Sequence, residues 1–146
     1  MRALLLLILL LSSGLSAYSQ STGEKSAESG NRASLSPSPE DLAQRQLNAY
    51  NARNIDAFLD PYADDVEIYD FPDQLRYKGK DTMRKQYGSM FERTKALHCE
   101  LVNRIILGNT VIDHERVTFD PNQAPVQAIA IYRIVNGKIK KVYFTR

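Results

Sequence analysis

The chain has 146 residues, a length that fits one domain. Its composition, 43% hydrophobic and 25% charged, is typical of a soluble globular protein. With 19 basic and 17 acidic residues the formal charge is +2, so charge gives no reason to expect a nucleic acid or an anionic membrane as partner.

Residues 1–19 have the pattern of a secretory signal peptide. Arg2 gives a positive start, Ala3–Leu11 is unbroken apolar sequence, and small residues surround an expected cleavage after Ala17 or Ser19. This apolar run is shorter than the roughly 20 residues that a membrane-spanning helix needs. We therefore expect a secreted or periplasmic protein with no membrane contact after cleavage; an uncleaved membrane anchor is the alternative.

Residues 20–37 are rich in Ser, Gly and Glu and poor in large apolar side chains, which predicts a disordered linker. The folded domain is then residues 38–146, long enough for one modest core. Its single cysteine, Cys99, cannot form an internal disulfide. Because Cys99 lies in a strand-like apolar alternation, we interpret it as a buried, unreactive thiol.

Two helices are predicted at the start of the domain. Ser38 is a typical N-cap followed by a proline and two acids, and apolar residues recur from Leu42 to Tyr50 at helical spacing. Asn54 caps a second, short helix. Gln46 borders the apolar face of the first helix, where its amide either orients a ligand or lies partly in water.

The next element, Val66–Phe71, alternates as a strand and puts Asp70 on the same face as Val66 and Ile68. Desolvation beside two aliphatic side chains would raise the pKa of Asp70 and make it a proton acceptor near neutral pH. In the alternative interpretation, Asp70 lies at a strand end and accepts hydrogen bonds from backbone N–H groups.

A third helix is predicted to begin at Asp81, after a loop that contains Arg76. Met83, Tyr87 and Met90 recur at helical spacing, so this helix buries a flexible, aromatic-rich face. Such a face is either plain core or the wall of an adaptable apolar pocket.

The rest of the chain is predicted to be β-structure. The strands are expected at Leu97–Leu107, Thr110–Asp120, Val126–Val135 and Lys138–Arg146. Asn136-Gly137 is a strong hairpin signal between the last two. The short basic run Lys138, Lys140 and Lys141 fits a solvated sheet edge better than a binding patch. Helices before a meander of antiparallel strands imply an α+β fold, a curved sheet wrapped around three helices.

Three segments resemble the NTF2-like, SnoaL-like superfamily, whose best-known enzyme is ketosteroid isomerase. They are residues 51–70 (NARNIDAFLDPYADDVEIYD), 79–84 (GKDTMR) and 132–142 (YRIVNGKIKKV). The resemblance runs from about Leu42 to Arg146. It implies the α+β cone of that superfamily and, for an enzyme, chemistry that needs no cofactor; the fold itself hosts many activities.

By this resemblance, Asp70 takes the place of the proton-shuttling aspartate of the isomerase. Gln46 stands where the isomerase has a tyrosine, and Ala130 where it has a second acid, so both usual oxyanion donors are missing. Loss of such donors is costly, which argues against steroid isomerase activity. Asp70 would then act as a base with Gln46 as a weaker donor.

Two further residues are candidates for chemistry. If His114 points inward, it can pair with Asp70 as an acid/base couple; otherwise it is a surface or core histidine without chemistry. Arg146, in register with Phe144, would hold an anionic substrate group at the open end. The two histidines and scattered acids have no metal-ligand spacing, so we expect no metal site.

Two functions follow as expectations. The first is an exported enzyme of isomerase, cyclase or lyase type that uses Asp70 on a small hydrophobic carbonyl or lactone-like compound. The alternative is a non-catalytic module that binds a small hydrophobic ligand or a protein partner. The expected pocket residues are Gln46, Tyr50, Tyr87, Met90, Ala130, Tyr132 and Arg146.

The outer face of the predicted sheet is a candidate surface for forming a homodimer. With Ala130 inward by analogy, strand alternation turns Ile129 and Ile131 outward. An outward apolar sheet face needs a cover, and members of the superfamily usually pair sheet to sheet, so we expect a homodimer.

Overall fold

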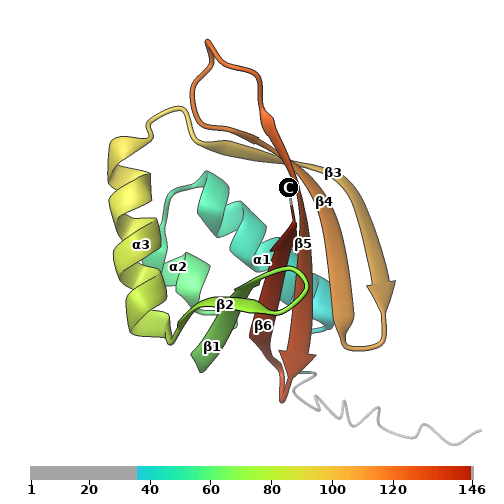
Figure 1. Cartoon of the computed structure of the whole chain (residues 1–146). Helices are drawn as coiled ribbons and strands as arrows, with labels where there is room; N and C mark the ends of the chain where they lie inside the picture. The colour runs from blue at the N-terminus through green and yellow to red at the C-terminus, as the bar shows by residue number, and fades with distance from the viewer. Residues whose placement is uncertain (1–35, 146) are drawn as a thin grey trace, which may run out of the picture. The chain divides into compact units, whose positions relative to one another are not determined.

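The computed structural model of the chain describes residues 36–145, in which three helices lie against one face of a curved sheet (Figure 1). The predicted signal peptide at 1–19, most of the predicted linker at 20–37 and Arg146 lie outside these described residues. Within them, no helix is long and apolar enough to cross a membrane.

The helices begin where side chains can bind their free N–H groups. In α1 (Pro39–Asn51), Ser38 accepts a hydrogen bond from the backbone N–H of Asp41, whose carboxylate accepts one from the backbone N–H of Ser38. In α2 (Ile55–Leu59), the side chain of Asn54 caps the first turn. Both starts agree with the sequence. The third helix, α3 (Lys80–Arg93), begins one residue before the predicted start.

Six strands form one open sheet in the order β2-β1-β6-β5-β4-β3. β1 and β6 run parallel, and every other neighbouring pair runs antiparallel. This arrangement confirms the predicted α+β fold, with the sheet wrapped around the helices. The strands are β1 (Tyr62–Asp70), β2 (Gln74–Lys78), β3 (His98–Leu107), β4 (Thr110–Thr118), β5 (Val126–Val135) and β6 (Lys138–Thr145).

Two details of the sheet differ from the sequence-based prediction. The segment predicted as a loop around Arg76 is the edge strand β2, whose largely exposed residues give no clean alternation of apolar and polar positions. The basic run of β6 does not lie on an edge, because β6 is flanked by β1 and β5. There Lys140 forms an ion pair with Asp65, and Lys141 with Glu67.

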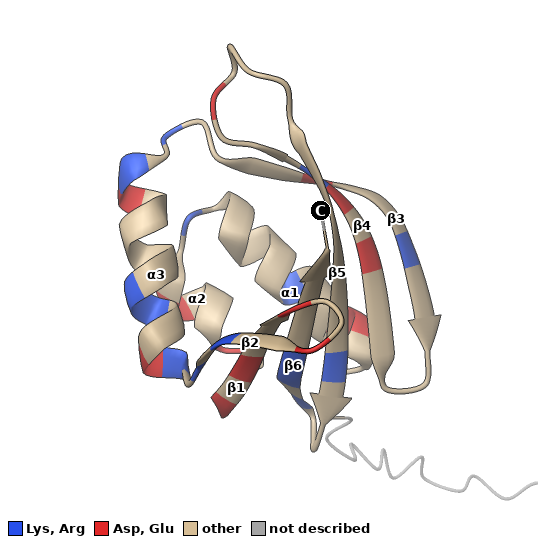
Figure 2. Ribbon diagram, viewed as in Figure 1, with Lys and Arg blue, Asp and Glu red and all other residues tan. Residues whose placement is uncertain are grey.

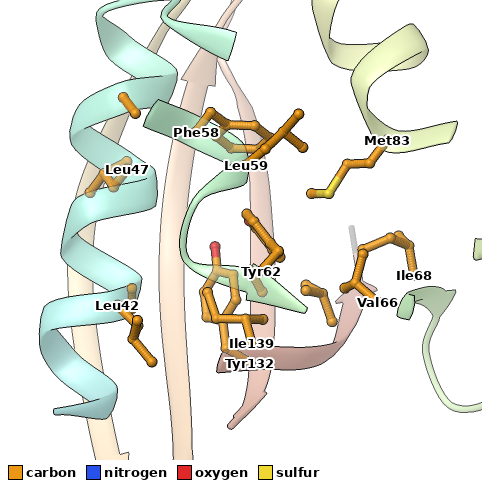
Figure 3. Packing of buried hydrophobic residues seen from close by; sticks show 14 of the residues in the cluster. Leu42, Leu47, Phe58, Leu59, Tyr62, Val66, Ile68, Met83, Tyr132 and Ile139 are labelled. Carbon is orange, nitrogen blue, oxygen red and sulfur yellow. The ribbon is translucent and has the colours of Figure 1, made fainter. Parts of the chain in front are cut away.

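The core lies between the helices and the inner face of the sheet (Figure 3). Leu42 and Leu47 of α1 and Phe58 of α2 point toward this interior, where they meet Met83 of α3 and Tyr132 of β5. Each of these side chains is at most 5% exposed. The helices contact different parts of the sheet: α3 meets it at β1 and β2, whereas α1 meets it at β3 and β4.

Candidate functional site

A cavity of about 620 Å³ lies between the helices and the inner face of the sheet. Its volume is within the range of about 300–1,000 Å³ that is common for small-molecule sites. The wall is mainly apolar and aromatic. These side chains are Leu47, Tyr50, Phe58, Tyr62, Ile68, Tyr77, Tyr87, Met90, Cys99, Val117, Phe119, Val126, Ala128, Tyr132 and Phe144.

A chain of hydrogen bonds crosses the wall of this cavity. The Tyr62 hydroxyl donates to Gln46 Oε1 (3.2 Å), and Gln46 Nε2 donates to the Tyr132 hydroxyl (3.0 Å). The Tyr132 hydroxyl in turn donates to Glu115 Oε1 (3.0 Å). All four side chains line the cavity and are at most 6% exposed. Gln46 therefore points inward and does not lie partly in water, whereas its contact with a ligand stays a prediction.

Glu115 is the acidic end of this chain and ionises near neutral pH. Burial raises its pKa to about 7, and the negative charge of Asp113 acts in the same direction. The hydrogen bond from Tyr132 and the charge of Arg104 oppose the rise without cancelling it. Burial also raises the pKa of Tyr132 well above its usual value, so its hydroxyl stays a donor. A carboxyl group with a pKa near 7 can both accept and release a proton under physiological conditions.

The neighbouring acid Asp113 is neutralised by a buried arginine. Both Asp113 oxygens accept hydrogen bonds from Arg104, from Nε and Nη2, each at 2.7 Å. The guanidinium also donates to Gln44 Oε1 on α1 (2.9 Å). Asp113 is fully buried and the Arg104 side chain is 8% exposed. Among residues 36–145, no cation is bound to the Glu115 carboxyl group in this way. Figure 2 shows acidic positions on β4, the strand next to the edge strand β3.

Asp70 does not have the desolvated setting that the sequence predicts. Its side chain is 40% exposed, and it lies beside the cavity without lining it. Arg76 holds both carboxylate oxygens, one through Nε (2.6 Å) and the other through Nη2. Arg76 is the extra residue of a β-bulge in β2, because it lies between the residue that pairs with Ile68 of β1 and the residue that pairs with Tyr69. The ion pair with Asp70 arises from this position. The bulge was not predictable from the sequence, because the segment around Arg76 was predicted as a loop.

His114 and Asp70 are not brought together. Asp113 and Glu115 are buried on the inner face of β4, so the alternation of the strand turns His114 to the outer face. There its Nε2 is hydrogen-bonded to Gln127 Oε1 of β5. His114 therefore does not point inward, and the acid/base pair with Asp70 that depended on an inward His114 does not form.

The remaining expected pocket residues divide into three groups. Tyr50, Tyr87, Met90 and Tyr132 line the cavity, although their contact with a substrate stays a prediction. Ala130 is buried in the core but does not line the cavity; Ala128, two residues earlier on the same face of β5, does. Arg146 lies outside the described residues.

Sequence reasoning missed Glu115, although a signal for it was present. Val111, Asp113, Glu115 and Val117 alternate along β4, and all four are at most 8% exposed. Two acids between two valines on one strand face indicate buried carboxyl groups that need partners or a function. The sequence could not predict that an arginine binds Asp113 and not Glu115, because Arg104 comes from another strand.

Two observations concern metal ligands and the single thiol. In the stretch from residue 36 to 145, no three His, Cys, Asp or Glu side chains are grouped so that they could hold a metal ion. Cys99 lines the cavity, but burial raises the pKa of its thiol far above the usual value, so it stays protonated and unreactive.

Comparisons with known proteins agree with this architecture. Residues 43–142 match the family model of the SnoaL-like domain. No curated protein sequence matches the chain. A protein of cystatin fold from Novosphingobium aromaticivorans is 25% identical, with a TM-score of 0.68 over 75% of this chain and 98% of that chain.

Two further solved structures share the fold. A candidate polyketide cyclase from Sinorhizobium meliloti is 16% identical, with a TM-score of 0.62 over 72% of this chain and 94% of that chain. A candidate ketosteroid isomerase from Kribbella flavida is 14% identical, with a TM-score of 0.59 over 73% of this chain and 75% of that chain. Together these similarities show an NTF2-like, ketosteroid-isomerase-like fold.

Proposed function

Because the chain belongs to the SnoaL-like domain family, we propose that it catalyses proton transfer on a small hydrophobic carbonyl compound, with Glu115 as the proton carrier. The reaction would be of isomerase, cyclase or lyase type. One observation carries the proposal: a carboxyl group with a pKa of about 7 lies in the wall of an apolar cavity and is oriented by the Tyr132 hydroxyl.

The chemistry needs one base and an oriented substrate. The Glu115 carboxylate would take a proton from the carbon beside the substrate carbonyl, and the electron pair of that C–H bond would form an enolate. Glu115 would then return the proton to another carbon, which is an isomerisation. Alternatively, the enolate carbon would attack a second carbonyl and close a ring; the π bond of that carbonyl breaks, and its oxygen takes the proton back from Glu115. Gln46 has a second amide N–H besides the one bound to Tyr132, and it can donate toward the enolate oxygen.

Similar proteins support this class of reaction but do not identify a substrate. Structures that share the fold include a candidate polyketide cyclase and a candidate ketosteroid isomerase. Because their sequence identity to this chain is low, these structures share only its fold, and the reacting groups must be identified among the residues of this chain. Asp70 is the base that the resemblance implies. We prefer Glu115 because Asp70 does not line the cavity and both of its oxygens are held by Arg76.

Deuterium exchange tests the proposal without knowledge of the natural substrate. The wild-type protein is expected to accelerate exchange of the protons beside the carbonyl of β-tetralone, an apolar ketone, as followed by proton NMR. Glu115→Gln keeps the shape and the acceptor for Tyr132 but removes the base, so the protein-dependent rate should fall by about 100-fold or more. Glu92→Gln, on the exposed side of α3, is the matched control.

The two carboxyl groups give opposite outcomes in this assay. If Asp70→Asn abolishes exchange while Glu115→Gln retains it, then Asp70 is the base, as the resemblance implies. If both variants behave like the wild type, neither acid carries the proton. Circular dichroism of each variant separates a loss of chemistry from a loss of folding.

A non-catalytic binding module is the second candidate. It is favoured by the fact that both acids near the cavity already have partners within the protein, Tyr132 for Glu115 and Arg76 for Asp70. A cavity built this way holds an apolar ligand whether or not the ligand reacts. Tight binding of ketones with exchange no faster than in buffer would identify this function.

We also propose that the chain is exported, on the basis of its first 19 residues. Expression in a Gram-negative host followed by N-terminal sequencing of the periplasmic fraction tests this. A mature start just after Ala17 or Ser19 is expected, and an intact Met1 in the membrane fraction would instead identify an anchor.

A further inference from the structure

The charged side chains that line the cavity are distributed unevenly. Of the lining residues within 36–145, Glu115 is the only acid, and it is deeply buried. In the described part of the chain, three cations line the cavity: Arg76 of β2 and Lys85 and Arg93 of α3. All three residues are exposed, as expected at a rim. The charge therefore changes from negative or neutral at the inner wall to positive at the opening.

Two of the rim cations are available to a ligand. Arg76 is occupied by Asp70. Within residues 36–145, by contrast, neither Lys85 nor Arg93 forms an ion pair.

The spacing along α3 lets these two cations act on one group. Lys85, Ser89 and Arg93 are four residues apart, so they follow one side of the helix, and all three line the cavity. Positions 85 and 93 are about 12 Å apart along the axis at 1.5 Å per residue, a distance that two long flexible side chains can close over Ser89. Figure 2 shows α3 beside the inner face of the sheet, with basic residues along its length.

We propose that the ligand of this cavity is an apolar carboxylate, bound with its carboxylate at the rim by Lys85, Ser89 and Arg93 and its apolar body against the aromatic wall. The inference rests on the proposed function in so far as the cavity must hold a ligand. Charge favours this orientation, because the reverse one would bring the carboxylate to Glu115. The reacting end of the ligand is then directed inward, toward the proton carrier.

A pair of fluorescent probes tests the charge requirement. Pyrenebutyrate carries a carboxylate, and pyrenebutanol is its neutral counterpart; their affinities for the full-length protein are measured by fluorescence anisotropy. Lys85→Gln and Arg93→Gln should each weaken pyrenebutyrate binding about twofold to fivefold, as expected for solvent-exposed ion pairs. The double variant should weaken it about tenfold, while pyrenebutanol changes less than about twofold.

Matched controls remove equal charge elsewhere. Lys95→Gln and Arg116→Gln alter exposed cations that do not line the cavity, and they should leave both affinities unchanged. Added salt should weaken binding of pyrenebutyrate but not of pyrenebutanol.

The outcomes distinguish this inference from the proposed function. If both probes bind the wild type equally, or the double variant weakens both equally, the anionic ligand is wrong and an apolar cavity ligand still stands. If neither probe binds, the inference fails together with the ligand-filled cavity on which the proposed function depends. If the control variants weaken pyrenebutyrate as much as the rim variants do, the effect comes from net charge and the rim site is wrong.

Discussion

At the scale of single residues, the molecule keeps two acids side by side on β4 in different electrostatic states. Asp113 has a guanidinium bound to both oxygens, whereas Glu115 has one neutral hydroxyl donor. A carboxylate without a cation is costly to bury, and the raised pKa of Glu115 expresses that cost. Function and stability are therefore expected to conflict at this position.

This conflict predicts the effect of pH on stability. Since the Glu115 pKa is about 7 in the folded state and near 4.5 in the unfolded chain, the folded protein retains a proton that the unfolded chain has lost between these values. The free energy of unfolding should therefore fall as pH rises from about 4.5 to 7, by up to about 3 kcal/mol. Glu115→Gln should be more stable than the wild type at pH 8 but not at pH 4.5. Urea unfolding at both values measures this, and an equal difference at both would contradict it.

The Asp113–Arg104 pair makes a second residue-scale prediction. Arg104→Leu leaves a buried carboxylate without its partner and should lower the free energy of unfolding by about 3–5 kcal/mol. Because the pair is isolated from water, removing both charges should be less harmful than removing one. The double variant Arg104→Leu/Asp113→Leu should therefore recover much of the loss in urea unfolding. A double variant no more stable than the single one would show that packing, not charge, dominates.

At the scale of elements, a single side chain connects the end of α1 to the edge strand β3. Asn51 Oδ1 accepts from the backbone N–H of Cys99 (2.7 Å), and Asn51 Nδ2 donates to the carbonyl of the same residue (2.9 Å). The amide thus continues the hydrogen-bonding pattern of the sheet where no further strand follows. It also fixes α1 over the strand that carries Cys99 into the cavity wall.

Replacing this amide should loosen the helix from the strand. Asn51→Ala leaves two backbone groups of Cys99 without their partner, at an expected cost of about 1–3 kcal/mol. Asn51→Asp keeps the acceptor but loses the donor, so it should fall between Ala and the wild type. Chemical denaturation of the three proteins tests the order, and hydrogen exchange at Cys99 should quicken in the Ala variant. Equal stability of all three would contradict the proposed link.

At the scale of the whole molecule, the outer face of the sheet carries an apolar row that crosses all six strands. Each member is the register partner of the next, and the tyrosine rings of β1 and β6 stack with centroids 4.9 Å apart. None of the three helices covers this face (Figure 1). The row consists of Ile105, Ile112, Ile131, Tyr143, Tyr69 and Leu75.

We propose that a second copy of the chain covers this row in a homodimer, since a self-complementary apolar face suits a two-fold interface. Ile131→Glu, at the centre of the row, should yield a monomer. Val135→Glu, an exposed apolar residue outside the row, should leave the dimer intact. Light scattering coupled to size exclusion measures both. A wild-type monomer at high concentration, or a dimeric Ile131→Glu, would contradict the proposal.

Much of the fold was predictable because its signals are local. The caps at Ser38 and Asn54, the helical spacing of α3 and the Asn136-Gly137 hairpin each depend on a few neighbouring residues. The expected arrangement of β5, with Ala130 inward and Ile129 and Ile131 outward, is confirmed, whereas the sequence left open which way His114 of β4 points. The sequence by itself therefore determined the order of most elements, the curved α+β architecture and an apolar interior.

Only the tertiary structure decided which acid is suited to proton transfer. Asp70 and Glu115 each share a strand face with two aliphatic residues, so local pattern cannot rank them. Their difference comes from partners distant in space or on an unpredicted element: Arg76 in the bulge of β2 for Asp70, and Tyr132 with the surrounding core for Glu115. Desolvation is a property of everything packed around a group, and it is fixed only when the whole chain has folded.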